Sequence, residues 1–216
     1  MGLNANNVKA PSKPKKVLEP DVYPIRLVQV IDLGLQPQNA FQGNAKPPCQ
    51  EISLTYEFCD EFMQDDDGND IPDKPRWLSE SIPFYPLFAD KAKSTQRYLA
   101  FDASQAFGGD FTKCLGLPAN LTVVNNAKGD LVYNNVGNLA AMSTKRIAQC
   151  PPLVNAPVSF DLDAPNMEVF NKLPKRLQDK IKSNLNFQGS KLQTALNGKP
   201  VKEEPAKAEV DGDVPY

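Results

Sequence analysis

The chain has 216 residues, of which 41% are hydrophobic, 20 are proline and none is histidine, and its formal net charge is −2. This length and apolar content fit one folded domain with extensions, or two small domains. The lack of histidine removes the most common general base, and the sequence has no apolar run long enough to cross a membrane. Because residues 1–20 lack the apolar centre of a signal peptide, we expect a cytoplasmic protein.

Charge is unevenly distributed along the chain. Residues 1–20 carry a net charge of +3, residues 60–73 contain seven acids and no base, and residues 199–216 carry −2. The remaining body therefore carries about +4. The overall charge argues against a nucleic-acid partner, but a mildly basic body with the net negative charge on a loop and a tail is compatible with one.

The hydrophobic pattern predicts three strands, a helical segment and two more strands after a flexible basic arm at residues 1–20. The expected elements are strands at 22–33, 51–58 and 76–83, a helix at 90–101, and a hairpin of strands 119–125 and 131–136. The Gly129-Asp130 pair is a typical hairpin turn between the last two strands.

The predicted strands have distinct faces, because successive side chains alternate. One face of the second strand carries four apolar side chains: Ile52, Leu54, Tyr56 and Phe58. In the third strand, Trp77 shares its face with Ser79 and Ser81, opposite Leu78 and Ile82. The only tryptophan therefore lies apart from the apolar set, although a core position is an equally good interpretation.

Two features resemble metal sites without matching them. The acidic segment contains Asp65-Asp66-Asp67-Gly68, but the residue that would close a calcium loop starting at Asp65 is Arg76, so a solvated hairpin loop is favoured. The four cysteines contain no Cys-x-x-Cys and would have to bind zinc from scattered loops, so free thiols are favoured. They are Cys49, Cys59, Cys114 and Cys150. We expect no metal and no other cofactor.

Residues 151–196 have a helical character. Asp163 is a candidate N-cap, and a second helix is expected from Pro174. An apolar stripe recurs at helical spacing in Leu173, Leu177, Ile181 and Leu185. The basic residues beside it favour a packing helix with a solvated face over a DNA-contacting helix. Residues 197–216 form a polar linker and an acidic tip.

The order of the predicted elements is typical of the OB-fold, a small five-stranded barrel with a helical segment between strands 3 and 4. We therefore predict a mainly β fold with α elements, in which residues 21–150 form an OB-fold domain. A β-sandwich is the alternative, since many small β domains produce the same order.

The end of the chain resembles the C-terminal tip of bacterial single-stranded DNA-binding proteins, which is acidic and ends in a hydrophobic residue, proline and an aromatic. The matching residues are Asp211, Asp213, Val214, Pro215 and Tyr216. Gly212 replaces a usual acid, and Tyr216 replaces a usual phenylalanine. The resemblance implies that the tip binds replication or recombination proteins, such as a polymerase, a helicase or primase, or a recombinase.

The body resembles phage-encoded single-stranded DNA-binding proteins of replication modules. The resemblance is carried by four segments that span roughly residues 20–145: residues 23–34, 52–57, 74–77 and 129–133. It implies an OB-fold that binds single strands without strong sequence preference, in the cytoplasm of a host cell.

Single-strand binding needs aromatic faces for the bases and cations for the phosphates. Trp77 and Tyr133 are the candidate stacking residues. The candidate phosphate contacts are Arg26, Arg76, Lys91, Lys93, Arg97, Lys128 and Lys145. RNA binding, and assembly of the chain into a homo-oligomer, are both left open by the sequence.

Two other classes of function were considered. No nucleophile motif or phosphate-binding glycine loop is present, so we expect no enzyme, although a nuclease would use acids such as Asp32, Glu57 and Asp102. A phage structural or assembly protein with a β-sandwich-like domain is the main alternative to DNA binding. It would form a stable oligomer without salt-dependent affinity for single strands.

Overall fold

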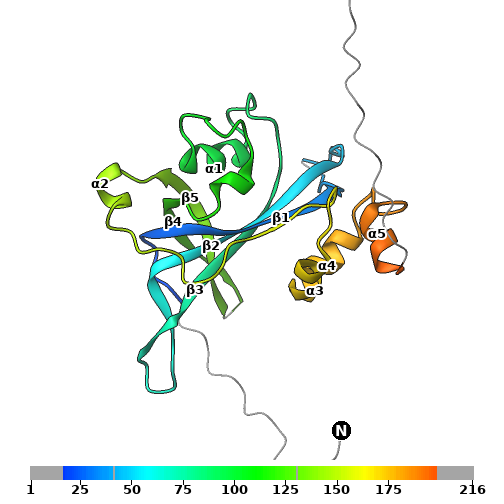
Figure 1. Ribbon diagram of the computed structural model, residues 1–216. Helices are drawn as coiled ribbons and strands as arrows, with labels where there is room; N and C mark the ends of the chain where they lie inside the picture. Colours follow the sequence, from blue (N-terminus) through cyan, green and yellow to red (C-terminus); the bar gives the residue numbers. More distant parts are fainter. Residues whose placement is uncertain (1–16, 41, 130, 199–216) are drawn as a thin grey trace, which may run out of the picture.

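The computed structural model describes residues 17–40, 42–129 and 131–198 (Figure 1). The strands are β1 (Val22–Gln36), β2 (Cys49–Gln64), β3 (Asp70–Pro83), β4 (Pro118–Lys128), β5 (Leu131–Ala141) and β6 (Val158–Phe160). The helices are α1 (Lys93–Phe101), the 3-10 helix η2 (Phe111–Cys114), α2 (Thr144–Ile147), α3 (Met167–Lys172), α4 (Lys175–Lys182) and α5 (Lys191–Leu196). The predicted order of three strands, a helix and two strands is confirmed.

The strands form one open, mainly antiparallel sheet in the order β3-β2-β1-β4-β5, with β6 parallel to β1. One edge of β1 pairs with β2, and the other pairs first with β4 and then with β6. Bulges between Leu27 and Gln29 and between Asp32 and Gly34 interrupt the β1–β2 register, and such bulges bend and twist a strand. No ladder joins β3 to β5 among the described residues, so the expected barrel is not closed by backbone pairing.

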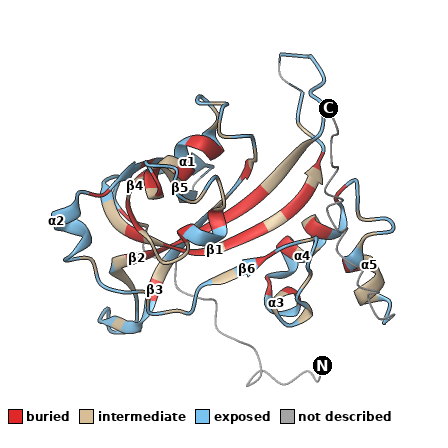
Figure 2. Cartoon of the chain, turned by 45° about the horizontal axis from the view of Figure 1, so that its top comes forward, coloured by how far each residue is buried: buried red, intermediate tan, exposed pale blue. Residues whose placement is uncertain are grey.

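The two faces of β1 contribute to two different hydrophobic cores. The first core lies between the curved sheet and α1, and Ile25, Leu27 and Val30 of β1 belong to it. The second core lies under the C-terminal helices and includes Ile31 and Leu33. Figure 2 shows the buried residues running along β1 and β2 between these layers. Two-sided burial explains why the sequence of β1 is an almost continuous apolar run.

The predicted faces of β2 and β3 are only partly confirmed. Ile52, Leu54, Tyr56 and Phe58 are buried in the first core, as expected. The opposite face of β2 was expected to be polar and solvated, but Ser53, Thr55 and Glu57 are also buried. They are buried because the chain after α2 crosses this side of the sheet on its way to β6.

The acidic segment is more ordered than a loop. Strands β2 and β3 extend into it, so that β3 begins at Asp70 rather than near Arg76. The Asp65 carboxylate closes the turn by accepting the backbone N–H groups of Asp67 and Asn69, each at 2.9 Å. The same bonds, together with that from the Asn69 side chain, lower the pKa of Asp65.

The C-terminal helices pack on the outer side of β1, at the opposite end of the sheet from α2 (Figure 1). Leu173, Leu177 and Ile181 are buried there, as predicted, but Leu185 is 52% exposed because α4 ends at Lys182. The predicted Asp163 cap is wrong. Helix α3 begins later, where the Asn166 side chain accepts the backbone N–H groups of residues 168 and 169. None of the helices in the described residues is long and apolar enough to span a membrane.

Candidate nucleic-acid interface

The β4–β5 hairpin presents an outward face that combines aromatic, aliphatic, amide and cationic groups. Directly paired residues of antiparallel strands share a face, and here the pairs are Asn126 with Tyr133, and Lys128 with Leu131. Tyr133 is 48% exposed and Leu131 is 61% exposed. The full outward face consists of Val124, Asn126, Lys128, Leu131, Tyr133 and Asn135.

The other side of this hairpin is fixed to the body of the protein. The side chains of Asn125 and Asn134 both donate to the carbonyl oxygen of Leu18, at 3.1 and 2.9 Å. Leu18 in turn donates its N–H to the Asn134 side chain at 2.9 Å, and Val123 is fully buried. The outward face of the hairpin is therefore supported by a bonded inner face, and the sequence predicted only Tyr133 and Lys128 of it.

Trp77 lies on the outer face of β3 and is 44% exposed. Its indole Nε1 donates to Glu57 Oε2 at 3.1 Å across the β2–β3 pair. Glu57 is itself buried, and its carboxylate also accepts the N–H of Val154 at 2.7 Å and the Asn155 side-chain N–H at 2.7 Å. One carboxylate thus orients the tryptophan ring and holds the chain segment that crosses the sheet.

Two predicted phosphate contacts have structural roles instead. Arg26 donates to three carbonyl oxygens, those of Gly116 at 2.6 Å, Cys150 at 2.8 Å and Pro151 at 2.5 Å. Arg97 is only 1% exposed and is one of the largest fully buried side chains among the described residues. Burial keeps the Arg97 guanidinium away from a phosphate, whereas Arg26 is partly exposed but uses all three of its guanidinium nitrogens on internal carbonyl oxygens.

Arg97 joins the two edge strands of the open sheet. Its Nε donates to Glu80 Oε1 of β3 at 2.7 Å, and its Nη2 donates to the carbonyl oxygen of Gly137 of β5 at 2.9 Å. Tyr56 and Lys93 also contact the Glu80 carboxylate, at 2.8 and 2.7 Å. Burial opposes ionisation of Glu80, but Arg97 and Lys93 outweigh it and lower its pKa. The β3–β5 seam is therefore bridged by a side-chain network.

The remaining predicted contacts are spread over the surface. Lys91 is exposed in the loop before α1, Lys93 is about half exposed and pairs with Glu80, and Lys145 is exposed on α2. Arg76 is half-buried beside Trp77 in β3. Only Lys128 shares a face with a candidate stacking residue. The tip residues Asp211, Asp213, Val214, Pro215 and Tyr216 lie outside the described residues.

Two exposed aromatics were not predicted. Tyr85 is 43% exposed and Phe88 is 88% exposed, both in the segment between β3 and α1. The available signal was their position next to two prolines: Tyr85 lies between Pro83 and Pro86, and Phe88 follows Pro86, so the apolar run cannot continue there as a paired strand.

The acids considered for a nuclease do not form a common centre. Asp32 accepts the side-chain N–H of Gln50 at 2.5 Å, and burial raises its pKa. Asp102 follows α1, where it accepts the Tyr98 hydroxyl at 2.7 Å and the N–H of Phe107 at 2.8 Å. Within the described residues, no group of three or more cysteine or carboxylate side chains is placed to hold a metal ion.

Comparisons with known proteins identify no relative. No protein-family model matches the chain, and neither the curated proteins nor the solved structures contain a match.

Proposed function

We propose that this chain binds single-stranded DNA without strong sequence preference, with bases stacking on Tyr133 and Trp77. In this proposal it protects single strands in the cytoplasm of a phage-infected cell. Its acidic tip recruits replication or recombination proteins.

The observation that carries the proposal is the outward face of the β4–β5 hairpin. A sequence-tolerant single-strand site needs an exposed aromatic face and a nearby cation. Tyr133 is 48% exposed, and the exposed Lys128 lies on the same face. The exposed amide of Asn126, directly opposite Tyr133, and the half-buried amide of Asn135 on the same face add hydrogen-bonding groups for base edges or phosphates. This set of side chains matches the chemistry of the ligand.

The connectivity supports an OB-type arrangement as part of the proposal. Strand β1 lies centrally and pairs with β2 and β4, a helix separates β3 from β4, and β3 and β5 are the edges that approach each other. OB-folds are partly open barrels that bind oligonucleotides on the face of strands 2 and 3 and on the loop between strands 4 and 5. Trp77 lies on the first of these regions and Lys128 on the second.

The charges define the limits of the proposed surface. The turn at residues 65–69 carries exposed carboxylates at the far end of β2 and β3, and like charge would repel a phosphate backbone there. We therefore place the strand near the seam between β3 and β5, rather than over the tip of the β2–β3 hairpin.

The test is a titration of fluorescent oligo-dT with the full chain at several salt concentrations, with duplex DNA of the same length as control. We expect tighter binding to the single strand than to the duplex, and an affinity that falls steeply with salt. No binding at low salt, together with a stable oligomer, would contradict the proposal and favour the structural or assembly role. Oligo-U of the same length measures the preference for DNA over RNA.

A further inference from the structure

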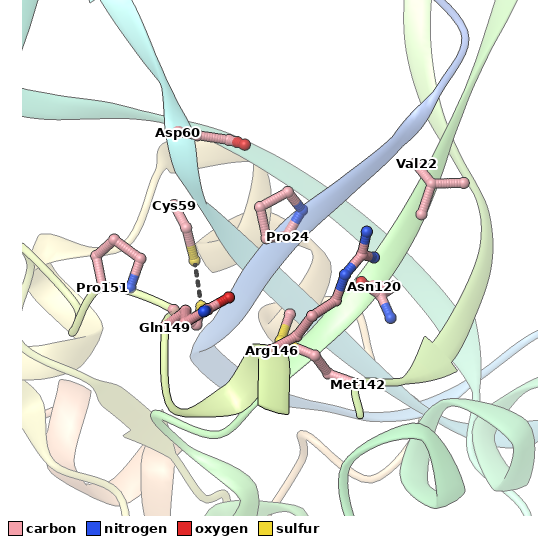
Figure 3. A pocket seen from close by; sticks show the side chains of 10 residues that line it. Val22, Pro24, Cys59, Asp60, Asn120, Met142, Arg146, Gln149 and Pro151 are labelled. Carbon is pink, nitrogen blue, oxygen red and sulfur yellow. Dashed lines mark hydrogen bonds between the residues drawn. The ribbon is translucent and has the colours of Figure 1, made fainter. Parts of the chain in front are cut away.

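Cys59 and Cys150 lie side by side although 91 positions separate them in the sequence. Their Sγ atoms are 3.1 Å apart, and both residues are partly exposed (Figure 3). The two sulfurs are not bonded, since a disulfide bond measures about 2.0 Å. They open onto a cavity of about 390 Å³ whose walls include Val22, Asn120 and Arg146. A small reagent in solvent therefore has access to this thiol pair.

Both sides of the pair are held in place by the fold. Cys59 is part of β2, directly after Phe58, which is buried in the first core. The segment that contains Cys150 is held by Arg26, which donates to the carbonyl oxygens of Cys150 and Pro151. A few residues further on, the buried Glu57 accepts the N–H of Val154. The short distance between the sulfurs thus results from two anchored segments.

We propose that Cys59 and Cys150 form a reversible disulfide when the protein meets a low-molecular-weight disulfide such as oxidised glutathione. One protein thiolate attacks the reagent, breaks its S–S bond and releases one glutathione thiolate, which leaves a mixed disulfide on the protein. The second protein thiolate then attacks the protein sulfur of that mixed disulfide and releases the second glutathione. The protein loses two protons and two electrons, and one oxidised glutathione becomes two reduced ones.

The surroundings of Cys59 give the reaction a pH dependence. Burial raises the pKa of the Cys59 thiol, and its hydrogen bond with Cys150 and the Cys150 charge raise it further. Arg26 opposes this increase, Asp60 adds to it, and Arg146 lines the same cavity from α2. Since the thiolate is the reacting form, oxidation is expected to accelerate as the pH rises from 7 to 9.

The bond would fasten the segment that crosses the sheet. It would tie the end of β2 to the chain between α2 and β6, and close a loop that includes β3, α1, β4, β5 and α2. Cross-linking a loop of this length restricts the unfolded chain. The oxidised protein is therefore expected to melt several degrees higher than the reduced protein.

The test is to incubate the folded, full-length wild-type protein with oxidised glutathione, quench with acid, and analyse it by intact mass and by peptide mapping without reduction. We expect a loss of two hydrogens, a linked peptide pair containing Cys59 and Cys150, and a fall from four titratable thiols to two after denaturation. Dithiothreitol should restore all four. Only glutathione adducts, or no change at pH 9, would overturn the proposal.

Cysteine variants provide the matched controls. A Cys49→Ser, Cys114→Ser double variant retains the proposed pair and should form the cross-link as wild type does, whereas Cys59→Ser and Cys150→Ser should retain only adducts. Cys114 is fully buried, so a reagent in solvent cannot reach it as it reaches the partly exposed Cys59 and Cys150, and it is not expected to compete. A cross-link between any other two cysteines in the folded wild type would contradict the assignment.

Discussion

Strands β3 and β5 each contribute to two regions with opposite properties. At the seam between them, the buried Arg97 links the partly buried Glu80 and Gly137 in a network that joins the open edges of the sheet. On the outward faces of the same strands, Trp77 and Tyr133 are exposed by nearly half. Since neighbouring residues in a strand point to opposite faces, β3 directs Glu80 towards the seam and Trp77 outward, whereas Gly137 of β5 contributes to the seam through its backbone carbonyl. The comparison shows that Arg97, a predicted phosphate contact, belongs to the internal network and not to the surface on which the candidate stacking residues lie.

The largest expected effect is a loss of stability when the network at the β3–β5 seam is broken. We predict that Arg97→Ala destabilises the protein by about 3–5 kcal/mol, because it leaves the buried Glu80 carboxylate without its main partner. The free energy of unfolding in urea is the appropriate measurement. Lys93→Ala is the matched control: it removes the other cation on Glu80, but from a side chain that is 47% exposed, so a loss below about 1 kcal/mol is expected. Equal losses in the two variants would show that burial does not distinguish the two ion pairs.

The core and the β3–β5 seam show how much of the fold could be predicted from the sequence. The hydrophobic pattern located five strands, because each has at least one face in the first core. The open β3–β5 seam could not be predicted, since it is bridged by an arginine from α1 that lies 17 positions from Glu80 and 40 positions from Gly137. Strand β6 was missed for a similar reason: three residues, Val158–Phe160, are too short for a period, and they are ordered by β1.

The outward faces of β3 and β5 show how much of the candidate site could be predicted from the sequence. Trp77 was separated from the apolar set by the serines on its face, and it is exposed on that face in the structure. The roles of Arg26 and Arg97 could not be predicted, because charge alone does not reveal whether a guanidinium finds carbonyl and carboxylate partners within the fold. The sequence placed Leu131 in a strand but did not indicate on which face of the sheet it lies. Its exposure follows only from the register of the hairpin.

On the outward faces, single aromatic substitutions should change binding more than they change stability. We expect Tyr133→Ala and Trp77→Ala each to weaken oligo-dT binding by about 1–3 kcal/mol, or roughly 5- to 150-fold, if each supports one stacked base. Trp77→Ala should also lower stability somewhat, because Glu57 loses one of its hydrogen bonds. Phe88→Ala, an aromatic that is 88% exposed but lies on neither face, is the control and should bind as wild type does.

A smaller effect on stability is expected from substitution of Asp102, which is buried at the end of α1. Burial opposes its ionisation, but hydrogen bonds from Phe107, Tyr98, Ser104 and Ala106 outweigh it and lower its pKa to about 2. A carboxyl with a lowered pKa stabilises the fold above its unfolded-state pKa, and this contribution is lost as the pH falls through about 2. The difference in the free energy of unfolding between wild type and Asp102→Asn should therefore be at its maximum at pH 5 and shrink towards pH 2. A constant difference would contradict the assignment.

The smallest expected effect concerns the single cation that shares a face with Tyr133. If Lys128 contacts one phosphate, Lys128→Gln should reduce the slope of log Kobs against log salt by about 0.7, with only a modest loss of affinity at low salt. Lys191→Gln on α5 removes the same charge from the helices over the second core, and should leave the slope unchanged. Equal changes in both variants would mean that binding responds to net charge alone. A change confined to Lys128 would locate the phosphate path on the β4–β5 hairpin, because an identical loss of charge elsewhere on the protein would then have no effect on counterion release.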